Sequence, residues 1–361
     1  MLQKSKFFVA GALALLSIMT IGALAFAKAR YSHVQYSSEE VPASSAQRES
    51  NSKPDQSNND VEKSGQPEQT NSTENYPNLF ELYIYGVDSR NNTTLDKGAN
   101  SDTIIVCQMC PATGEVRLIS VMRDTFVMTP DGKRGKINGY YCKSGAAETS
   151  GILNDYIDLS IRKFVTVNWK SVAEAIDKIG GIDLYLSSAE LNNLNRQIVE
   201  TSKVTGIPCN SIENAGDGVY HLNGVQAVGH ARNRQVGKHD EERTRRQRDI
   251  LSAILVSAQK LSAPELIQIA DETLMGVMTN VSFEEIVSLI PLVTKCHVTV
   301  TESFPFHYRM QLEGSWYVYP ETLESNVTIL HSLLYPGTDY EPSDHTKEIS
   351  ANVSAYANEN P

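Results

Sequence analysis

The sequence predicts an α/β fold, with a mixed β-sheet flanked by helices and an N-terminal transmembrane anchor. Three observations lead to this prediction. From Leu79 onward, short runs rich in Val, Ile and Tyr alternate with helical patterns, as they do in α/β domains. Two of these runs flank the turn "CPATG" and therefore form an antiparallel hairpin. The chain also opens with an apolar run, 7–27, that is long enough to cross a hydrocarbon core of about 30 Å.

The N-terminal part of the chain divides by composition. Residues 1–6 are short and basic and are expected to form a cytoplasmic end before the anchor at 7–27. A cleaved signal peptide is the alternative interpretation, because "ALA" and "AFA" suit cleavage, but the run exceeds the usual signal core of about 7–15 residues. Residues 31–76, rich in Ser, Asn, Gln, Glu and Pro, predict a disordered linker. Under either interpretation the remainder is expected to be exported.

One domain is expected at 79–335, because no composition break divides it, and a disordered tail is expected at 336–361. Within the domain, a strand, a helix and a strand at 162–168, 169–179 and 182–186 form a βαβ unit, whose strands are expected to be parallel. The other strands are expected at 79–87, 103–109, 115–121 and 297–303. The other helices are expected near 264–275, 282–292 and 321–334.

The five cysteines do not form a recognisable metal site. Cys107 and Cys110 make a C-x-x-C pair, but strand spacing places them on opposite faces, and no second pair completes a zinc site. A disulfide between Cys142 and Cys209 is chemically allowed outside the cytoplasm, although the sequence does not fix connectivity.

The predicted hairpin brings charged residues together. If its turn is centred within "CPATG", Asp102 and Arg123 lie directly opposite each other at its open end. Asp88 follows the strand at 79–87, so an adjacent strand pairing would gather Asp88, Asp102, Arg123 and Asp124 at one sheet edge. Ligand sites in α/β sheets commonly form at such strand ends. For any one aspartate, surface salt bridging or turn capping is the alternative.

Six arginines crowd into "HARNRQVGKHDEERTRRQRDIL" (230–251), although the chain carries a net charge of −11. A helix is expected to begin at the N-cap residue Asp240. Arg243, Gln247 and Ile250 then lie at i, i+4 and i+7 on one helical face. Because the isoleucine must face the core, Arg243 and Gln247 are expected to point inward as well.

The neighbouring arginines are expected to divide between the same site and the solvent. "VGHARNR" is predicted to be a strand that points Arg232 and Arg234 to one face. Arg245 and Arg248 project elsewhere and are expected to be solvated. Several inward guanidinium groups require an anion of more than one charge, because an unpaired buried charge is strongly destabilising.

Phosphate or pyrophosphate fits this anion, since guanidinium groups bind phosphate oxygens bidentately. A nucleic-acid groove would be a broad basic stripe interleaved with aromatic residues, whereas this chain is acidic and its arginines are confined. Carboxylates beside a phosphate require a divalent cation, so Mg²⁺ (or Mn²⁺) is expected at Asp88 and Asp102. The sequence contains no Walker-type glycine loop.

A set of short segments occurs in the order of a known family. The segments are "YGVDSR" (85–90), "NSDTIIV" (100–106), "ISVMRDTFV" (119–127), "GKINGYY" (135–141), "IGGIDLYL" (179–186), "YHLNGVQAVGHARNR" (220–234) and "DEERTRRQRDIL" (240–251). Over about 79–335 the chain thus resembles the LytR-CpsA-Psr family of cell-wall glycopolymer ligases. The resemblance implies a mixed α/β fold with a hydrophobic tunnel for a polyprenyl chain. It also implies an enzyme that transfers polymer-phosphate from polyprenyl pyrophosphate to a hydroxyl of peptidoglycan, with teichoic acids and capsular polysaccharides as typical cargo.

The resemblance also assigns roles by position. It implies that Asp88 and Asp102 bind the metal. The side chains that it implies for pyrophosphate binding are Arg90, Arg123, Arg232, Arg234, Arg243 and Gln247. The residues expected to be catalytic are Arg123, Asp102 and Asp124. Either Asp124 or another acid that does not hold the metal is the candidate to accept the proton of the incoming hydroxyl.

The chain departs from the family pattern at two positions. Met122 stands where many members have Pro, and His230 replaces a common Tyr; neither change removes a charge, so both bear on substrate choice. Lys136 either adds charge to the pocket or is a solvated turn lysine. The apolar runs 251–256 and 286–293 either line the lipid tunnel or belong to an ordinary core.

The expected protein is therefore a single-pass protein of the cell membrane with its catalytic domain outside the cytoplasm. Its expected partners are a polyprenyl-pyrophosphate-linked glycopolymer, peptidoglycan and the membrane itself, and not nucleic acid. Two other functions remain open on the sequence alone. One is a non-catalytic envelope regulator that binds lipid phosphates, and the other is a polyprenyl-pyrophosphate hydrolase.

Overall fold

The computed structural model describes residues 34–42, 79–88, 95–129, 131–233, 236, 239–262, 265, 268–269, 276–282, 284–285 and 295–359. Within these residues no helix is both long enough and apolar enough to cross a membrane. The expected cytoplasmic end and anchor (1–6 and 7–27) and most of the helices expected near 264–275 and 282–292 lie outside the described residues, as do Arg90 and Arg234.

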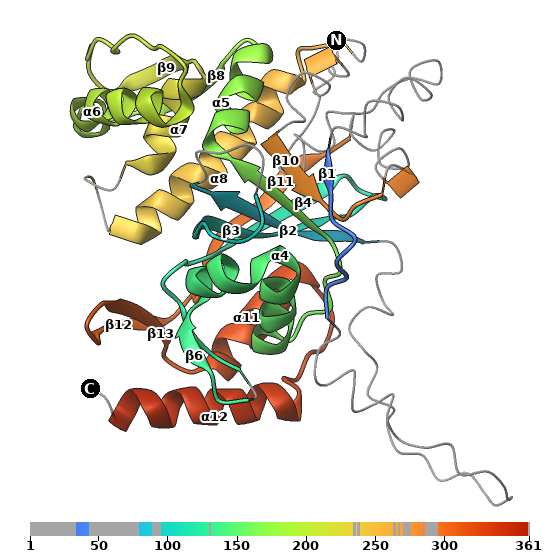
Figure 1. Cartoon of the computed structure of the whole chain (residues 1–361). Coiled ribbons are helices and arrows are strands. Elements are labelled where there is room, and N and C mark those ends of the chain that lie inside the picture. The colour runs from blue at the N-terminus through green and yellow to red at the C-terminus, as the bar shows by residue number, and fades with distance from the viewer. Residues whose placement is uncertain are drawn as a thin grey trace, which may run out of the picture.

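A seven-stranded mixed sheet forms the centre of the fold (Figure 1). In order across the sheet, its strands are β1 (Gln35–Tyr36), β10 (Val277–Thr279), β7 (Phe164–Asn168), β2 (Phe80–Val87), β3 (Ser101–Met109), β4 (Glu115–Val121) and β11 (His297–Phe304). The strand pairs β2–β3, β3–β4 and β7–β10 are antiparallel, whereas β2–β7, β4–β11 and β1–β10 are parallel. The predicted mixed α/β fold is confirmed.

Helices cover both faces of this sheet, because its central strands alternate apolar side chains to either side. Leu82 and Ile84 of β2 face one core, and Tyr83 and Tyr85 face the other. The helices of the first layer are α5 (Trp169–Lys178), α6 (Ser188–Thr205), α7 (Gly224–Arg232) and α8 (His239–Ala258). Those of the second layer are α4 (Ile137–Ile157), α11 (Leu323–Leu334) and α12 (Asp344–Glu359). The sheet lies between these layers (Figure 1).

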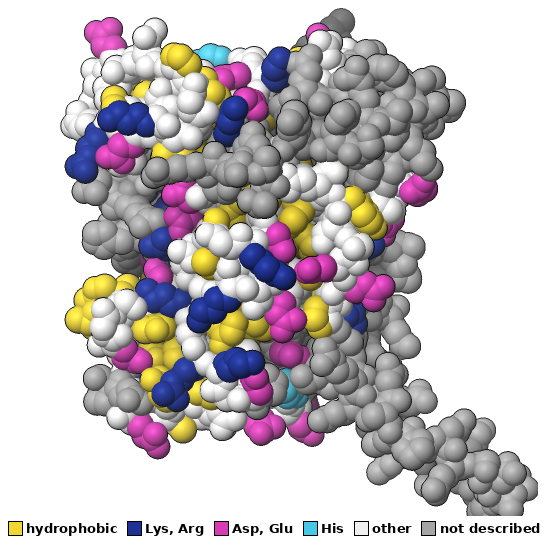
Figure 2. Space-filling view, viewed as in Figure 1, with side chains coloured by type: hydrophobic (Ala, Val, Ile, Leu, Met, Phe, Trp, Pro, Cys, Tyr) yellow, Lys and Arg dark blue, Asp and Glu magenta, His cyan; other side chains and the backbone are white. Residues whose placement is uncertain are grey.

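The described part of the chain also contains three small two-stranded sheets. They pair β5 (Phe126–Met128) with β6 (Arg134–Lys136), β8 (Ile182–Leu186) with β9 (Gly218–Leu222), and β12 (Tyr308–Leu312) with β13 (Trp316–Pro320). On the face shown in Figure 2, basic and acidic side chains are interspersed, and hydrophobic side chains gather over the β12–β13 hairpin. Met310, Leu312 and Trp316 of this hairpin are exposed.

The expected parallel pairing of the strands at 162–168 and 182–186 is wrong. β8 leaves the central sheet and pairs antiparallel with β9, while β10 lies beside β7. Gly180 and Gly181 both adopt positive φ, 88° and 87°, and this turn directs the chain away from the sheet. β8 also exposes alternate residues, which suits an outlying ribbon rather than a strand buried on both faces.

Two segments expected to be disordered are in part ordered. Residues 34–42, within the predicted linker at 31–76, contribute β1 and the buried Val41. The predicted disordered tail at 336–361 instead contains α12, whose Ile349 and Val353 lie four residues apart and are buried in the second core. That spacing is the helical signal which the polar composition of the tail concealed.

A strand was also expected at "VGHARNR", and this segment is instead the end of α7. The helix begins with a capping box in which Asn223 accepts from the backbone N–H of Gln226 and the Gln226 side chain accepts from the backbone of Asn223. This start signal lies upstream of the segment that was predicted to be a strand. No disulfide joins the five cysteines, all of which lie in the described part of the chain.

Candidate active site

The hairpin β3–β4 has the register that the sequence predicts. Cys107 lies opposite Leu118 and Ile105 lies opposite Ser120, and the same register places Asp102 across from Arg123 beyond the end of the ladder. Arg123 Nη1 donates to Asp102 Oδ1 at 2.6 Å. The predicted meeting of these two side chains is confirmed.

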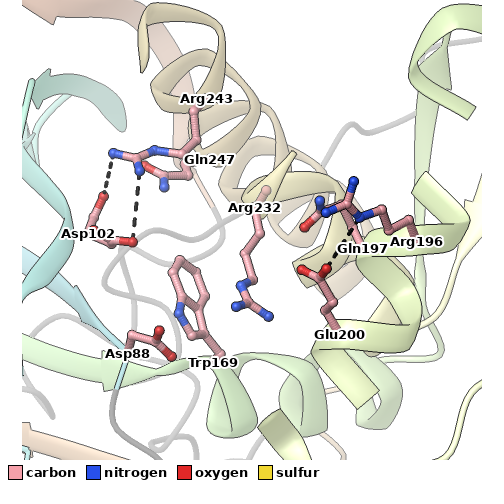
Figure 3. Close-up of a pocket in the computed structure, with 10 residues that line it drawn as sticks. Asp88, Asp102, Trp169, Arg196, Gln197, Glu200, Arg232, Arg243 and Gln247 are labelled. Atoms are coloured by element: carbon pink, nitrogen blue, oxygen red, sulfur yellow. Dashed lines mark hydrogen bonds and ion pairs between the residues drawn. The ribbon is translucent and has the colours of Figure 1, made fainter. Parts of the chain in front are cut away.

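A cavity of about 290 Å³ opens beside this pair. Its lining residues are Asp88, Asp102, Trp169, Arg196, Gln197, Glu200, Ala231, Arg232, Arg243 and Gln247. They come from the end of β2, the start of β3, the start of α5, the middle of α6, the end of α7 and the first turns of α8 (Figure 3). Arginines that are far apart in the sequence therefore meet aspartates from the sheet edge in one cavity.

Arg243 and Gln247 point inward from α8, as the helical spacing predicted. Both are buried, with 1% and 5% of their surfaces exposed. Arg243 Nη2 donates to the backbone oxygen of Asp102 at 3.2 Å, and its Nη1 lies 3.8 Å from Asp102 Oδ2. Within the described residues, neither the amide nitrogen nor the amide oxygen of Gln247 has a hydrogen-bond partner. Because unsatisfied buried polar groups are costly, this arrangement favours a polar ligand in the cavity.

Arg232 reaches the cavity from the last residue of α7, so the expected position is right although the expected strand is not. Its Nη1 donates to Thr201 Oγ1 on α6 at 3.1 Å. In Figure 3 its guanidinium lies between Trp169 and Glu200. The side chain is thus oriented by α6, and it lines the cavity.

Asp124 and Lys136 pair with each other beside the cavity rather than lining it. Lys136 Nζ lies 2.8 Å from Asp124 Oδ1, and Arg123 Nε lies 3.4 Å from Asp124 Oδ2. Lys136 also lies over the Tyr317 ring, 5.2 Å from its centroid. The Asp124 carboxylate therefore lies between two basic side chains.

The remaining arginines of α8 have structural contacts. Arg245 is half exposed and pairs with Glu242 and Asp249, as expected. The expectation that Arg248 is solvated is wrong, because it is buried and its Nη1 donates to Ser303 Oγ on β11 at 2.8 Å. A helix packed on a sheet over most of its circumference offers few solvated positions.

Arg246 makes a buried ion pair and also contacts the backbone of two residues that follow α7. Its Nε donates to Glu190 Oε1 at 2.9 Å, and its Nη groups donate to the backbone oxygens of Asn233 and Val236 at 3.0 and 2.9 Å. Burial alone would raise the pKa of Glu190, but hydrogen bonds from Ser187 and Arg246 lower it to about 2. Burial lowers the pKa of the neighbouring His230 to about 4, so this imidazole is neutral at pH 7.

Sequence reasoning missed the wall of the cavity that α5 and α6 supply. This wall consists of Trp169, Arg196, Gln197 and Glu200. The spacing of Arg196 and Glu200, four residues apart, was a readable signal, and their Nε and Oε1 atoms lie 3.4 Å apart. Such pairs are common on exposed helices, so the spacing alone does not indicate a cavity.

Asp88 and Asp102 suit a cation that is shared with a ligand. Both line the cavity, and Mg²⁺ is usually held by one or two carboxylates together with substrate phosphates. Among the described residues, no group of three or more His, Cys, Asp or Glu side chains could enclose a metal. The donor set therefore fits a cation completed by phosphate oxygens rather than a closed protein site.

Comparison with known proteins identifies the family. The sequence model of the LytR_cpsA_psr family matches residues 42–329. The chain belongs to the LytR-CpsA-Psr family. The chain is 28% identical over 211 residues to the polyisoprenyl-teichoic acid–peptidoglycan teichoic acid transferase TagV of Bacillus subtilis, an alignment that covers 57% of this chain and 51% of TagV. The chain thus spans about half the length of this relative.

Solved structures of the LytR-CpsA-Psr family share the fold. The crystal structure of B. subtilis TagV is 25% identical, with a TM-score of 0.54 over 73% of this chain and 98% of that one. TagT with bound octaprenyl pyrophosphate lipid is 18% identical, with a TM-score of 0.52 over 74% and 94%. Among the sequence relatives, biofilm regulatory protein A of Streptococcus mutans is 27% identical over 49% of this chain and 43% of that protein.

Proposed function

We propose that this protein transfers an anionic glycopolymer, of the wall teichoic acid or capsular polysaccharide type, from a polyprenyl-pyrophosphate carrier to a hydroxyl of peptidoglycan. The observation that carries the proposal is the cavity that Arg232, Arg243 and the unsatisfied Gln247 line together with Asp102, itself paired with Arg123. Buried guanidinium groups beside an open polar cavity match a pyrophosphate. Family membership and the transferase TagV among the relatives support the same activity.

The residues have distinct roles in the proposed reaction. Arg232 and Arg243 bind the non-bridging oxygens of the pyrophosphate and stabilise the charge that develops as its bridging bond breaks. Arg123 orients Asp102 through their 2.6 Å contact. Gln247 supplies an amide donor to the same oxygens, which satisfies its buried side chain. We assign Arg90 and Arg234, which lie outside the described residues, to the same binding role.

A divalent cation, Mg²⁺ or Mn²⁺, is part of the proposal. Asp88 and Asp102 would hold it, and when bound it would neutralise the phosphate oxygens that face these carboxylates. Without it, two aspartates at the cavity would repel the pyrophosphate. The proposed location is the cell membrane, with residues 7–27 as a single-pass anchor, 1–6 in the cytoplasm and the catalytic domain outside it.

The test is product analysis with the full-length chain reconstituted in detergent micelles. The protein is incubated with a polyprenyl-pyrophosphate-linked glycan, a peptidoglycan fragment and Mg²⁺, and the products are identified by mass spectrometry. The expected result is acceptor carrying the polymer through a phosphodiester, together with an equal amount of polyprenyl phosphate. Release of polyprenyl phosphate without any modified acceptor would instead identify a pyrophosphate hydrolase.

A non-catalytic regulator is the second candidate, since a biofilm regulatory protein is among the relatives. A regulator would bind the lipid pyrophosphate in the same cavity and leave it intact. Lipid binding and product formation, measured on one sample, distinguish the two functions. Bound lipid that is recovered unchanged after incubation with acceptor and Mg²⁺ favours the regulator.

A further inference from the structure

The cavity contains a third carboxylate, Glu200, that the sequence did not predict. It lies on α6, on the wall opposite Asp88 and Asp102, and its carboxylate points toward the side chain of Arg232 (Figure 3). Nearly half of its side-chain surface is exposed, 47%, so a second substrate entering the cavity can reach it. The proposed reaction must remove a proton from the acceptor hydroxyl, and an accessible carboxylate can accept it.

Two of the other acidic groups near the cavity, Asp102 and Asp124, have basic partners. Asp102 accepts from Arg123 at 2.6 Å and lies 3.8 Å from Arg243. Asp124 lies between Lys136 and Arg123 and does not line the cavity. Asp88 lies on the same side as Asp102, where the two together suit the cation. A carboxylate bound to a cation is a weak base, which favours a proton acceptor on the opposite wall of the cavity.

Glu200 is held on that wall by its own helix. Arg196, one turn earlier, lies 3.4 Å from its Oε1 atom, a contact between two exposed side chains that leaves the other oxygen accessible. The next residue, Thr201, accepts a hydrogen bond from Arg232 at 3.1 Å. The backbone of α6 therefore fixes Glu200 beside the arginine that we assign to the pyrophosphate.

We propose that Glu200 is the general base of the transfer, an inference that rests on the proposed function. The acceptor hydroxyl oxygen forms a bond to the phosphorus that carries the glycan, and the bond from that phosphorus to the bridging oxygen breaks. The bridging oxygen takes the bonding electron pair and leaves as polyprenyl phosphate. The hydroxyl proton passes to a Glu200 carboxylate oxygen, and the product is a phosphodiester.

The arrangement of charges suits this direction of attack. In phosphoryl transfer the entering and leaving oxygens lie roughly in line on opposite sides of phosphorus. The leaving phosphate belongs on the side of Arg243, where Asp88 and Asp102 would hold the proposed cation, and the entering hydroxyl belongs on the side of Glu200. Among the described residues that line the cavity, the charged groups on the side of Glu200 are Arg196 on its own helix and Arg232 on α7, while α5 contributes the neutral Trp169.

The test compares Glu200→Gln with two matched variants in the full-length, lipid-loaded protein. Glu200→Gln keeps the shape of the side chain and removes the base, so kcat should fall by roughly 10²-fold or more while binding of the lipid pyrophosphate is retained. The acid limb of the kcat–pH profile, along which kcat falls as the pH is lowered, should be absent from this variant. Arg196→Gln removes the ion pair but keeps the carboxylate, so this acid limb should remain. Glu213→Gln, an exposed position outside the cavity, should behave as the wild type.

The outcomes separate the inference from the proposed function. A wild-type protein that forms no phosphodiester product overturns both. An active wild type whose Glu200→Gln variant has the same kcat and pH profile overturns the inference alone. Loss of the acid limb in Asp88→Asn and its retention in Glu200→Gln would also overturn it, because the proton would then pass to the other wall.

Discussion

Arg123 and Asp102 form an ion pair across the open end of the β3–β4 hairpin, with Arg123 Nη1 2.6 Å from Asp102 Oδ1. The same aspartate accepts from Arg243 of α8 through its backbone oxygen, across a sequence separation of 141 residues. The sheet edge and the helix thus orient one carboxylate from two sides. The position of Asp102 is set by the register of the hairpin, which depends only on residues close together in the sequence.

Arg123→Lys tests whether this pair requires a planar guanidinium. Arg123 contacts Asp102 and Asp124 with different nitrogens, and a lysine ammonium cannot reproduce this fork. We expect the polymer-transfer rate to fall by roughly 10²-fold, with little change in thermal stability. Arg245→Lys, a matched change at an exposed arginine of α8, should have no effect on rate. Equal transfer rates for the Arg123→Lys variant and the wild type would remove Arg123 from the catalytic set.

Gln247→Leu should weaken ligand binding while leaving the stability of the fold nearly unchanged. The buried amide of Gln247 has no hydrogen-bond partner in the described structure, so its replacement by an apolar side chain of similar size should change the free energy of unfolding by less than about 1 kcal/mol. Affinity for a lipid pyrophosphate should fall by about tenfold, because one donor to the phosphate is lost. Urea unfolding and a lipid-binding titration measure the two effects.

Gln108→Leu is the matched control for that variant. Gln108 is equally buried, but its amide donates to Glu81 at 2.8 Å and accepts from Arg117 at 3.1 Å. Its loss should destabilise the protein by about 1–3 kcal/mol, because both partners are left without it. If Gln247→Leu destabilises the protein as much as this control does, the side chain of Gln247 serves the fold rather than a ligand.

The local features of this site could be predicted from the sequence, because short-range geometry determines them. The turn within "CPATG" fixes which residues of β3 and β4 face each other, and so places Asp102 opposite Arg123. Helical periodicity fixes the face that Arg243 and Gln247 share with the buried Ile250. Both predictions require only the spacing of residues within one element or one hairpin.

The features that the sequence did not predict depend on long-range packing. Glu200 and Arg196 have the pattern of any exposed helix, and only the packing of α6 against α7 brings them to the cavity. The buried state of Arg248 likewise results from Ser303 on β11, 55 residues away. The sequence did not predict that β8 pairs with β9 and not within the sheet of β7. A βαβ pattern does not indicate whether its second strand leaves the sheet.

Arg246→Met should be strongly destabilising although Arg246 does not line the cavity. The change leaves Glu190, whose side chain is 10% exposed, without its buried partner, and it removes two donors to the backbone after α7. Breaking a buried ion pair in this way costs about 3–5 kcal/mol. Urea unfolding measures the loss. Arg245→Met, at a half-exposed arginine whose nearest partners are Glu242 and Asp249 and which lies 3.8 Å from Glu190, should cost less than about 1 kcal/mol. Equal costs at the two positions would mean that the Arg246–Glu190 pair does not stabilise the fold.

His230 and His331 should make the protein less stable in mild acid. Burial lowers the pKa of each imidazole to about 4, whereas an unfolded histidine titrates near 6.5. Between these values the unfolded chain binds protons that the folded chain does not, so the free energy of unfolding should fall as the pH drops from about 6.5 to about 4. The loss should be on the order of 3 kcal/mol per histidine. Urea unfolding at several pH values measures it, and His230→Gln and His331→Gln should each remove part of the slope. A double variant that keeps the full slope would assign it to other groups.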